Sequence, residues 1–394
     1  MIKPNLTFDI VIVGGGTAGS GVAASLLKRN QHLNVAIIDP ADKHYYQPAW
    51  TLVGAGEFDA AKSERGMSDC IPKGAKWLQA SVTGFDPDNN NLQTDKFGGI
   101  SYQHLIVTAG LKLDWGAIKG LTETLGKNGV TSNYRFDLAP YTWELVQNLK
   151  EGKALFTQPP MPIKCAGAPQ KAMYLSCSHW EHEKVLNNID VDFNNAGAVL
   201  FGVKEYVAPL MEYVERYNAN LSFQSTLVEV DGPNKKAWFN VKNADGNVIK
   251  VKKLFDMLHV VPPQVAPDFI KQSVLANEGG WVDVDQHTLQ HVRYNNIFSL
   301  GDVCSTPNAK TMAAARKQVV VAAENLLALR AGQAMTSRYD GYGSCPLTVE
   351  KGKIILAEFS YGGKLAPTLT GIQPNQESQL GYLKNMACLG FIGI

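Results

Sequence analysis

The feature that most constrains the fold is an apolar run followed at once by three spaced glycines near the N-terminus. Residues 10–13 form the continuous apolar run that is typical of a buried parallel strand. Gly14, Gly16 and Gly19 then follow with the spacing Gly-x-Gly-x-x-Gly. In such a loop the first glycine allows a tight turn, the second lets the backbone approach a pyrophosphate, and the third lets a helix pack against the strand. We therefore predict a helix over roughly 20–28 whose N-terminal amides face the phosphates of a dinucleotide.

A second predicted strand, over 34–38, ends at Asp39. An acidic residue at the end of this strand is the group that binds a ribose hydroxyl in dinucleotide-binding units. A glycine-rich turn in an ordinary α/β unit is the alternative. The ordered series of strand, glycines, helix, strand and acid favours the dinucleotide site.

Length and composition exclude several classes of protein. A chain of 394 residues predicts two or three domains, and a net charge of +1 provides no strong field for nucleic acid. We expect no signal peptide, because the first strand begins within a few residues of Met1, and no apolar run reaches the roughly 18 residues that span a bilayer. Six scattered cysteines without a Cys-x-x-Cys pair favour neither a disulfide scaffold nor a metal site.

The remaining patterns predict an α/β fold with two Rossmann-like dinucleotide-binding units and a C-terminal region. The expected domains are residues 1–112 with 262–338, then 113–261, then 339–394. Further helices are predicted over 138–149, 171–186, 206–217 and 311–331. Further strands are predicted over 77–82, 102–110, 153–157, 196–203, 222–230, 236–241, 248–252, 296–302 and 353–359.

The second unit lacks the glycine motif of a nicotinamide site. We place its key strand and turn at 197–206, where only Gly197 and Gly202 are present. The bulky side chains of Phe201 and Tyr206 would hinder the approach of a pyrophosphate. The second unit is therefore expected to keep the fold without the ligand, so that electrons reach the first cofactor from another source.

Cys165 and Cys345 are the candidate redox residues. Each lies in a turn among small or special residues, and Cys165 directly precedes a predicted helix, with Lys164 and Lys171 nearby in the sequence. Helix amides and lysines lower the pKa of a thiol, and the thiolate is the nucleophile of thiol–disulfide exchange. The alternative is that both are buried small apolar residues, which is the usual role of a free cysteine. Cys70, Cys177, Cys304 and Cys388 lack this context.

At this point the chain resembles the sulfide:quinone oxidoreductases, in the two-cysteine variety found in mitochondria and some bacteria. The matching stretches are 44–56, 163–171, 257–263, 280–285 and 339–347, which span nearly the whole chain. The run Cys-Ala-Gly-Ala-Pro-Gln-Lys at 165–171 is the most specific of them. The distant bacterial members carry a third redox cysteine upstream of this pair, and here none lies between Cys70 and Cys165.

The resemblance implies a flavoenzyme that contains FAD. Sulfide would attack a Cys165–Cys345 disulfide and leave a persulfide on Cys345, the Cys165 thiolate would deliver two electrons to the flavin, and FAD would pass them to a quinone. The sulfur would go to an acceptor thiol, sulfite or sulfide. The cofactor contacts implied by position are Gly14, Gly16, Thr17, Ala18, Gly19, Asp39, Gln47, Val82, Gly110, Asp302 and Thr311. Phe359 and Phe391 are candidates for the quinone pocket, and Lys317 receives no role.

The C-terminal tail departs from the family pattern. The family ends in amphipathic helices that dock on a membrane. Here residues 380–394 contain two late glycines, Gly390 and Gly393, and a single basic residue, Lys384. The expectation is a peripheral, weakly attached protein on the bacterial inner membrane, acting as a homo-oligomer that multiplies weak contacts.

Three alternatives remain open on the sequence. An NADH:quinone oxidoreductase of similar fold requires the glycine motif that the second unit lacks. A dithiol reductase of the glutathione-reductase type requires a close cysteine pair in the first domain, which is also absent. A flavin-binding sulfur sensor or carrier without turnover is excluded only by steady-state quinone reduction.

Overall fold

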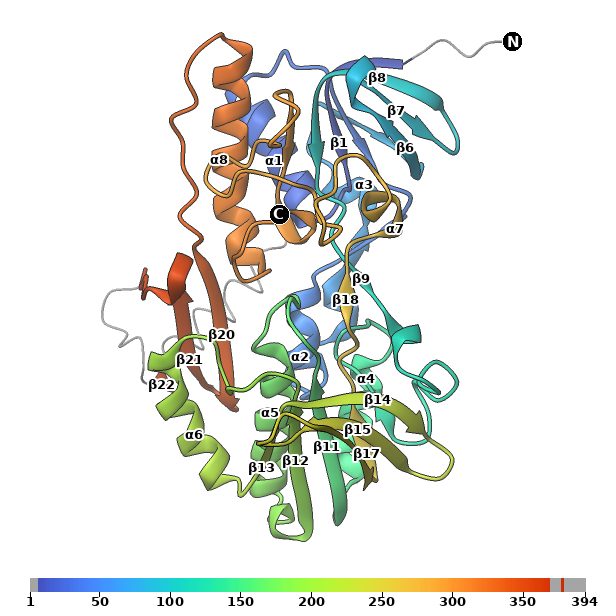
Figure 1. The fold of residues 1–394 in the computed structure, drawn as a ribbon, viewed down its shortest axis with the longest axis vertical. Coiled ribbons are helices and arrows are strands. Elements are labelled where there is room, and N and C mark those ends of the chain that lie inside the picture. The colour runs from blue at the N-terminus through green and yellow to red at the C-terminus, as the bar shows by residue number, and fades with distance from the viewer. Residues whose placement is uncertain (1–5, 369–376, 379–394) are drawn as a thin grey trace. The chain divides into compact units, whose positions relative to one another are not determined.

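The protein is described here from a computed structural model that covers residues 6–368 and 377–378 (Figure 1). The chain forms two compact units. The first contains residues 1–44, 65–112 and 265–343, and the second contains 45–64, 113–264 and 344–394. The chain crosses between them within five strands: β3 (Lys43–Tyr45), β4 (Glu64–Gly66), β9 (Lys112–Leu113), β18 (Gln264–Val265) and β20 (Gly343–Glu350).

The first unit is built on one mixed sheet. Five strands run parallel in the order β5 (Ala75–Leu78), β2 (Val35–Ile38), β1 (Leu6–Val13), β8 (Gly98–Val107) and β19 (Ile297–Ser299). Beyond β8 the sheet continues with antiparallel β7 (Asn91–Thr94) and β6 (Val82–Asp86). Val13 pairs with both Ile38 and Val107, so β1, β2 and β8 end at the same edge.

Two long helices accompany this sheet. α1 (Thr17–Arg29) and α8 (Met312–Arg330) lie side by side, as the blue and orange helices of Figure 1 show. The short helices α3 (Met67–Cys70) and α7 (Asp268–Lys271) complete the unit. α1 begins three residues before the expected start, because Gly16 is its N-cap.

The second unit contains a parallel sheet and an antiparallel one. The parallel order is β10 (Val130–Thr131), β17 (Met257–His259), β11 (Gly152–Gln158), β12 (Ile189–Asn195) and β13 (Asn220–Phe223). The antiparallel sheet consists of β14 (Ser225–Asp231), β15 (Lys236–Lys242) and β16 (Val248–Leu254). The helices are α2 (Trp50–Val53), α4 (Ala139–Asn148), α5 (Ala168–His182) and α6 (Val207–Arg216).

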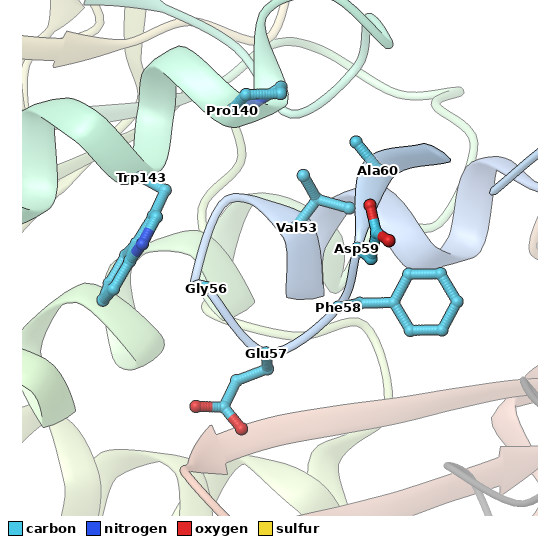
Figure 2. A pocket seen from close by; sticks show the side chains of 8 residues that line it. All are labelled: Val53, Gly56, Glu57, Phe58, Asp59, Ala60, Pro140 and Trp143. Atoms are coloured by element: carbon cyan, nitrogen blue, oxygen red, sulfur yellow. The ribbon is translucent and has the colours of Figure 1, made fainter. Parts of the chain in front are cut away.

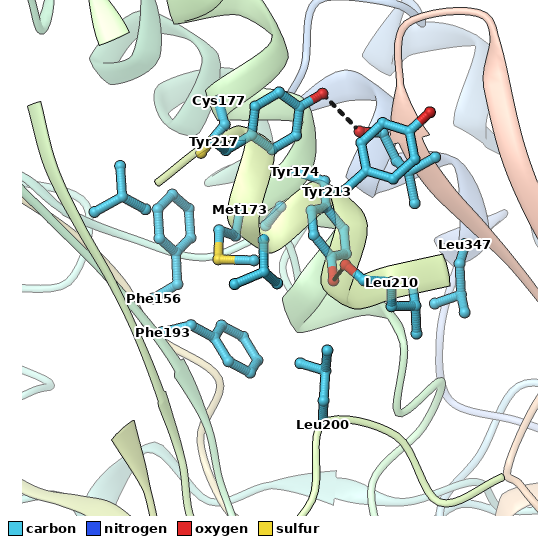
Figure 3. Close-up of a cluster of buried hydrophobic side chains, with 14 of the residues drawn as sticks. Phe156, Met173, Tyr174, Cys177, Phe193, Leu200, Leu210, Tyr213, Tyr217 and Leu347 are labelled. Atoms are coloured by element: carbon cyan, nitrogen blue, oxygen red, sulfur yellow. Dashed lines mark hydrogen bonds between the residues drawn. The ribbon is translucent and has the colours of Figure 1, made fainter. Parts of the chain in front are cut away.

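The C-terminal strands belong to the core of the second unit. β20, β21 (Lys353–Phe359) and β22 (Glu377–Ser378) form one sheet. Leu347 and Val349 of β20 are fully buried in a cluster with Tyr174 and Trp180 of α5, part of which Figure 3 shows. The expectation of a separate region from residue 339 is therefore corrected, because residues of β20 and β21 share this core. Residues 45–64 also differ from the expected division, since Trp50 and Val53 pack on Ala139 in the second unit.

The strand predicted over 196–203 is wrong. The strand of this region is β12, which ends at Asn195, and the next residues form bends. The Asn195 side chain stops the strand: its Oδ1 accepts from the Gly197 amide at 2.8 Å and its Nδ2 donates to the Val199 carbonyl at 2.9 Å. Leu200 and Phe201 are buried, so their apolar run packs against the core as a loop. The strand predicted over 77–82 likewise divides, with β5 ending at Leu78 and β6 beginning at Val82.

Candidate active site

The glycine loop between β1 and α1 has the backbone geometry of a dinucleotide site. Gly14 has a φ of +102°, and a Cβ there would lie 2.6 Å from the Thr108 carbonyl oxygen at the end of β8. A Cβ on Gly19 would collide with the carbonyl oxygen of Gly14. Any side chain at either position would thus push the strand, the turn and the helix apart.

Gly16 differs from the other two glycines because no atom of the described residues lies near the position that its Cβ would take. A Cβ built on Gly16 has no neighbour within 4 Å, and its φ of −65° suits any residue. No side chain caps the N-terminus of α1, and no acidic residue lies in its first turn. The loop therefore leaves both the room and the amide donors that an anionic group requires.

Asp39 lies against this loop at the end of β2. Its Oδ2 accepts from the Gly15 amide at 2.6 Å and its Oδ1 accepts from the Ala41 amide at 2.8 Å. These two bonds fix the carboxylate, and each oxygen retains a lone pair for a further donor such as a ribose hydroxyl. His44, absent from the sequence prediction, lies near Gly15 and Asp39, and burial lowers its pKa.

The other predicted cofactor residues are distributed over both units. Val82 begins β6, Gly110 has a φ of +68°, and Asp302 lies in a single helical turn after β19. Thr311 caps α8, where its hydroxyl oxygen accepts from the Ala314 amide at 3.2 Å. Gln47 is the exception, because it lies in the second unit, where its Oε1 accepts from the ammonium group of Lys164.

Cys165 and Cys345 meet in the second unit. Their Sγ atoms lie 3.4 Å apart, although 180 residues separate them in the sequence. Both are free thiols in this structure, Cys345 being buried and Cys165 partly buried. Sulfurs in contact need only a small movement to form a disulfide, so the geometry permits a disulfide between these two residues.

Two local backbone features make this contact possible. Cys165 has a φ of +51°, a left-handed conformation that costs a non-glycine residue about 1–2 kcal/mol. Cys345 lies on the regular strand β20, which passes close to Gly167 at the N-cap of α5. A Cβ on Gly167 would lie 2.6 Å from the Cys345 Sγ and would also collide with Leu347. The glycine is thus required for the close approach of β20.

The electrostatics polarise the pair toward a Cys165 thiolate. A hydrogen bond from the Cys345 thiol lowers the pKa of Cys165 most, and the ammonium of Lys171 and the Ala168 amide lower it further, against the effect of burial. The same hydrogen bond and burial raise the pKa of Cys345. Burial alone would lower the pKa of Lys171, but the adjacent thiols outweigh it and raise that pKa. Lys171, only 8% exposed, is therefore a buried cation that stabilises the Cys165 thiolate.

We expect Lys171→Met to move the alkylation of Cys165 by iodoacetamide to higher pH. The thiolate is the reactive form, and it is present above the lowered pKa and lost as the pH falls through it. Removal of the ammonium raises that pKa, so the rate at pH 6 should fall roughly tenfold, which corresponds to about 1.4 kcal/mol of lost interaction. The measurement is the pH profile of the Cys165 peptide by mass spectrometry on reduced protein.

Lys164→Met is the matched control for this prediction. The Lys164 ammonium is directed to Gln47 and lies over the rings of Trp50 and Tyr134, at 5.8 and 5.6 Å from their centroids. Because the Lys164 ammonium hydrogen-bonds to Gln47, whereas that of Lys171 hydrogen-bonds to Cys165, its removal should leave the profile near that of the wild type. An equal shift in both variants would contradict a specific role for Lys171.

The other described cysteines do not form such a pair. Burial raises the pKa of Cys177 and Cys70, and Cys304 hydrogen-bonds to Thr306. Cys388 lies outside the described residues. Within residues 6–368 and 377–378, no group of three or more His, Cys, Asp or Glu side chains could hold a metal ion. In the same part of the chain no helix combines the length and apolar character needed to cross a bilayer.

Other predicted or conspicuous positions have contacts of their own. A pocket of about 440 Å³ lies between α2, the loop 56–60 and α4, and Figure 2 shows that its lining includes Trp143, Phe58 and Glu57 but no predicted site residue. Phe359 packs its ring against that of Phe201 at 6.0 Å, and Lys317 lies over the ring of Tyr342 at 5.2 Å. Phe391 and the rest of the tail from 379 lie outside the described residues.

Because residues 196–203 do not form a strand, a nicotinamide motif in the second unit would lie at a different turn from the one predicted at 197–206. The central strand of the second parallel sheet that leads into a helix is β11, and the connection from β11 to α5 spans residues 159–167. This connection contains three prolines, Cys165 and a single glycine, Gly167. The turn that binds pyrophosphate in a Rossmann unit therefore carries Cys165 in this chain.

Two Rossmann-like units, a glycine loop with room for a dinucleotide and a buried dithiol define an oxidoreductase of the flavoprotein disulfide reductase type. Residues 8–189 match the family described as pyridine nucleotide-disulphide oxidoreductase. The chain is 44% identical to the mitochondrial sulfide:quinone oxidoreductase of Dictyostelium discoideum over 95% of this chain and 81% of that protein. It is 39% identical to the mitochondrial enzyme of the same name from Mus musculus, over 96% and 83% of the two chains.

The solved structure of the sulfide:quinone oxidoreductase from Aquifex aeolicus has the same fold. It superimposes with a TM-score of 0.80 at 16% identity, covering 98% of this chain and 90% of that one. The chain belongs to the sulfide:quinone oxidoreductase family, and it is an enzyme. The resemblance stated from the sequence motifs and the predicted fold class are thereby confirmed.

Sequence reasoning missed three residues that shape the thiol site. Gly167 admits β20, Tyr134 donates its hydroxyl to the carbonyl oxygens of Lys164 and Cys165, and Gln264 accepts from the Lys164 amide at 2.7 Å. Tyr134 and Gln264 lie 31 and 99 residues from Cys165 in the sequence, so no local pattern connects them with it. Gly167 lies within the matching stretch 163–171, and Gln264 directly follows the stretch 257–263. This proximity is the only signal that the sequence offers for these two residues.

Proposed function

We propose that the protein oxidises sulfide through a disulfide between Cys165 and Cys345 and passes two electrons through FAD to a quinone. The observation that carries the proposal is the pair of thiols in contact at 3.4 Å, with the buried ammonium of Lys171 beside them. Relatives named sulfide:quinone oxidoreductase, which match over most of this chain, support the substrates.

The polarity of the pair decides which sulfur receives sulfide. Hydrosulfide attacks Cys345, a bond forms between the two sulfurs, the Cys165–Cys345 bond breaks, and Cys165 leaves as a thiolate. The thiol with the lower pKa is the better leaving group, and Cys165 has the lowered pKa. The product is a persulfide on Cys345, and its outer sulfur is then transferred to an acceptor thiol, sulfite or sulfide.

FAD fits the glycine loop of the first unit. Gly16 and the uncapped amides of Thr17, Ala18 and Gly19 would hold the pyrophosphate, and the Asp39 carboxylate would bind a ribose hydroxyl. Val82, Gly110, Asp302, Thr311 and Gln47 remain proposed contacts. When bound, the flavin accepts two electrons from the thiol site and donates them to the quinone.

We expect Gly16→Ala to weaken FAD binding without unfolding the protein. The added methyl group meets no atom of the described residues within 4 Å, so it occupies space that the proposal assigns to the pyrophosphate. The dissociation constant should rise about tenfold or more, because a steric overlap costs about 1–3 kcal/mol. Flavin titration of the apoprotein measures this change.

Gly84→Ala in β6 is the control, because its Cβ also has no neighbour within 4 Å. It should leave both the flavin affinity and the thermal unfolding unchanged. If Gly16→Ala bound FAD with unaltered affinity, the assignment of the pyrophosphate to this loop would be wrong.

Anaerobic stopped-flow spectroscopy of the wild-type holoprotein tests the proposed activity. Sulfide should bleach the flavin absorbance rapidly, NADH should not, and added quinone should restore it. The β11–α5 connection, with its prolines and single glycine, supports the expected failure of NADH. Bleaching by NADH alone would favour the NADH:quinone oxidoreductase instead, and a lack of steady-state quinone reduction would favour a sensor or carrier.

Peripheral attachment to a membrane and homo-oligomerisation belong to the same proposal. A quinone dissolved in lipid must be reached at the membrane surface, and weak contacts multiply in an oligomer. Vesicle flotation of the full chain, with its tail, tests the first point, and sedimentation velocity tests the second.

A further inference from the structure

The loop that carries Cys165 is tied to the body of the second unit at the Lys164 amide and at the carbonyl groups of Lys164 and Cys165. Tyr134 Oη lies 3.0 Å from the Lys164 carbonyl oxygen and 3.3 Å from the Cys165 carbonyl oxygen. The Cys165 carbonyl also accepts from the Ala168 amide at 2.8 Å. On the other side, the Lys164 amide donates to Gln264 Oε1 at 2.7 Å. These bonds hold the two peptide groups that flank the left-handed Cys165.

Tyr134 is itself rigidly placed. It is only 4% exposed and packs with Ala168 and Val261. Its amide donates to Ser132 Oγ at 3.1 Å, and the preceding Asn133 amide donates to His259 Nε2 at 3.0 Å. Burial raises the pKa of Tyr134, so its hydroxyl remains a proton donor over the whole working range of pH. The parallel sheet thus supports the hydroxyl through β10 and β17.

Cys345 does not need such support. It lies within β20, where the ladder and the core cluster determine its position. Cys165 lies in a loop and has a positive φ of +51°, which a cysteine leaves when nothing opposes relaxation. The contact of the sulfurs therefore depends on the groups that hold Cys165.

We propose that Tyr134 is a positioning residue whose hydroxyl, bound to the carbonyls of Lys164 and Cys165, holds Cys165 in the conformation that places its sulfur against Cys345. This inference rests on the proposed Cys165–Cys345 disulfide. Loss of the Tyr134 hydroxyl lets the loop relax, so the Cys165 sulfur spends less time in contact with the Cys345 sulfur. The disulfide is then less stable relative to the dithiol. Loss of the hydroxyl also moves the Cys165 sulfur away from the groups that stabilise its thiolate.

The experiment measures the disulfide equilibrium of the full-length holoprotein under anaerobic conditions. Protein is equilibrated with mixtures of reduced and oxidised dithiothreitol. Reduced dithiothreitol supplies two electrons and two protons to the Cys165–Cys345 bond and becomes the cyclic disulfide. The free thiols are trapped with a maleimide and the bridged fraction is counted by peptide mass spectrometry. The alkylation profile of Cys165 against pH is recorded on the same variants.

Tyr134→Phe should shift this equilibrium about tenfold toward the dithiol, which corresponds to a potential about 30 mV less negative. It should also move the alkylation of Cys165 to higher pH. Tyr217→Phe is the matched control, because the Tyr217 hydroxyl, also buried, donates to the Val349 carbonyl on β20 at 2.9 Å. The control loses a bond of the same kind in the same unit and should change neither readout.

Gln264→Leu provides a second, independent variant. It removes the acceptor of the Lys164 amide and should shift both readouts in the same direction as Tyr134→Phe, so the test remains available if Tyr134→Phe does not fold. The role of Tyr134 would be overturned if the wild type forms the disulfide and both Tyr134→Phe and Gln264→Leu keep the disulfide equilibrium and the alkylation profile of the wild type. Absence of the bridge in the wild type at every ratio would overturn the proposed disulfide itself.

Discussion

Cys165→Ser and Cys345→Ser should each abolish the reduction of bound flavin by sulfide. A serine hydroxyl neither forms the disulfide nor leaves as a thiolate, so both variants lose the bond that sulfide attacks in the proposed reaction. We expect the rate of flavin reduction to fall by at least about 10³-fold. Losses of this size follow when one member is removed from a set of catalytic residues that act together. Anaerobic stopped-flow absorbance at the flavin band measures this rate.

Cys70→Ser is the control for both variants. Cys70 is a partly exposed thiol in the first unit, at the end of α3, and takes no part in the pair. This variant should reduce its flavin as fast as the wild type. If either Cys165→Ser or Cys345→Ser also did so, the disulfide would not be the electron path and the catalytic assignment would fail.

Gly167→Ala should disrupt the same chemistry while both cysteines remain present. The new methyl group would lie 2.6 Å from the Cys345 sulfur and would also overlap Leu347, so β20 must move away from α5. Overpacking of this kind destabilises a protein by about 1–3 kcal/mol. We expect the sulfide-dependent rate to fall by more than about tenfold, because a displacement near 1 Å from a reacting group has a large kinetic effect.

Gly202→Ala is the matched control for this substitution. Gly202 is exposed, lies in the same unit, and a Cβ there has no neighbour within 4 Å. Urea unfolding and stopped-flow reduction of the two variants separate the loss of stability from the loss of chemistry. A normal rate in Gly167→Ala would show that the 3.4 Å contact is not needed for turnover.

Local patterns in the sequence predicted much of the fold. The apolar run and glycine spacing at 10–19 led to β1, the tight turn and α1, because strand period, glycine placement and helix start are all decided within a few residues. The strand over 353–359 agrees with β21, and the long helix over 311–331 agrees with α8 to within one residue at each end. The prediction over 196–203 failed because a buried apolar run has the same local pattern in a loop as in a strand.

The tertiary structure decided the active site. Local context singled out Cys165 and Cys345 but could not place them together, because their contact spans 180 residues and depends on β20 joining the core of the second unit. The left-handed backbone of Cys165, the space left by Gly167 and the support from Tyr134 are likewise set by residues far apart in the chain. The sequence by itself therefore determined the kind of protein through its short motifs. Long-range packing alone determined the sulfur contact and the polarity of the thiol pair, since distances and burial arise only when distant segments fold together.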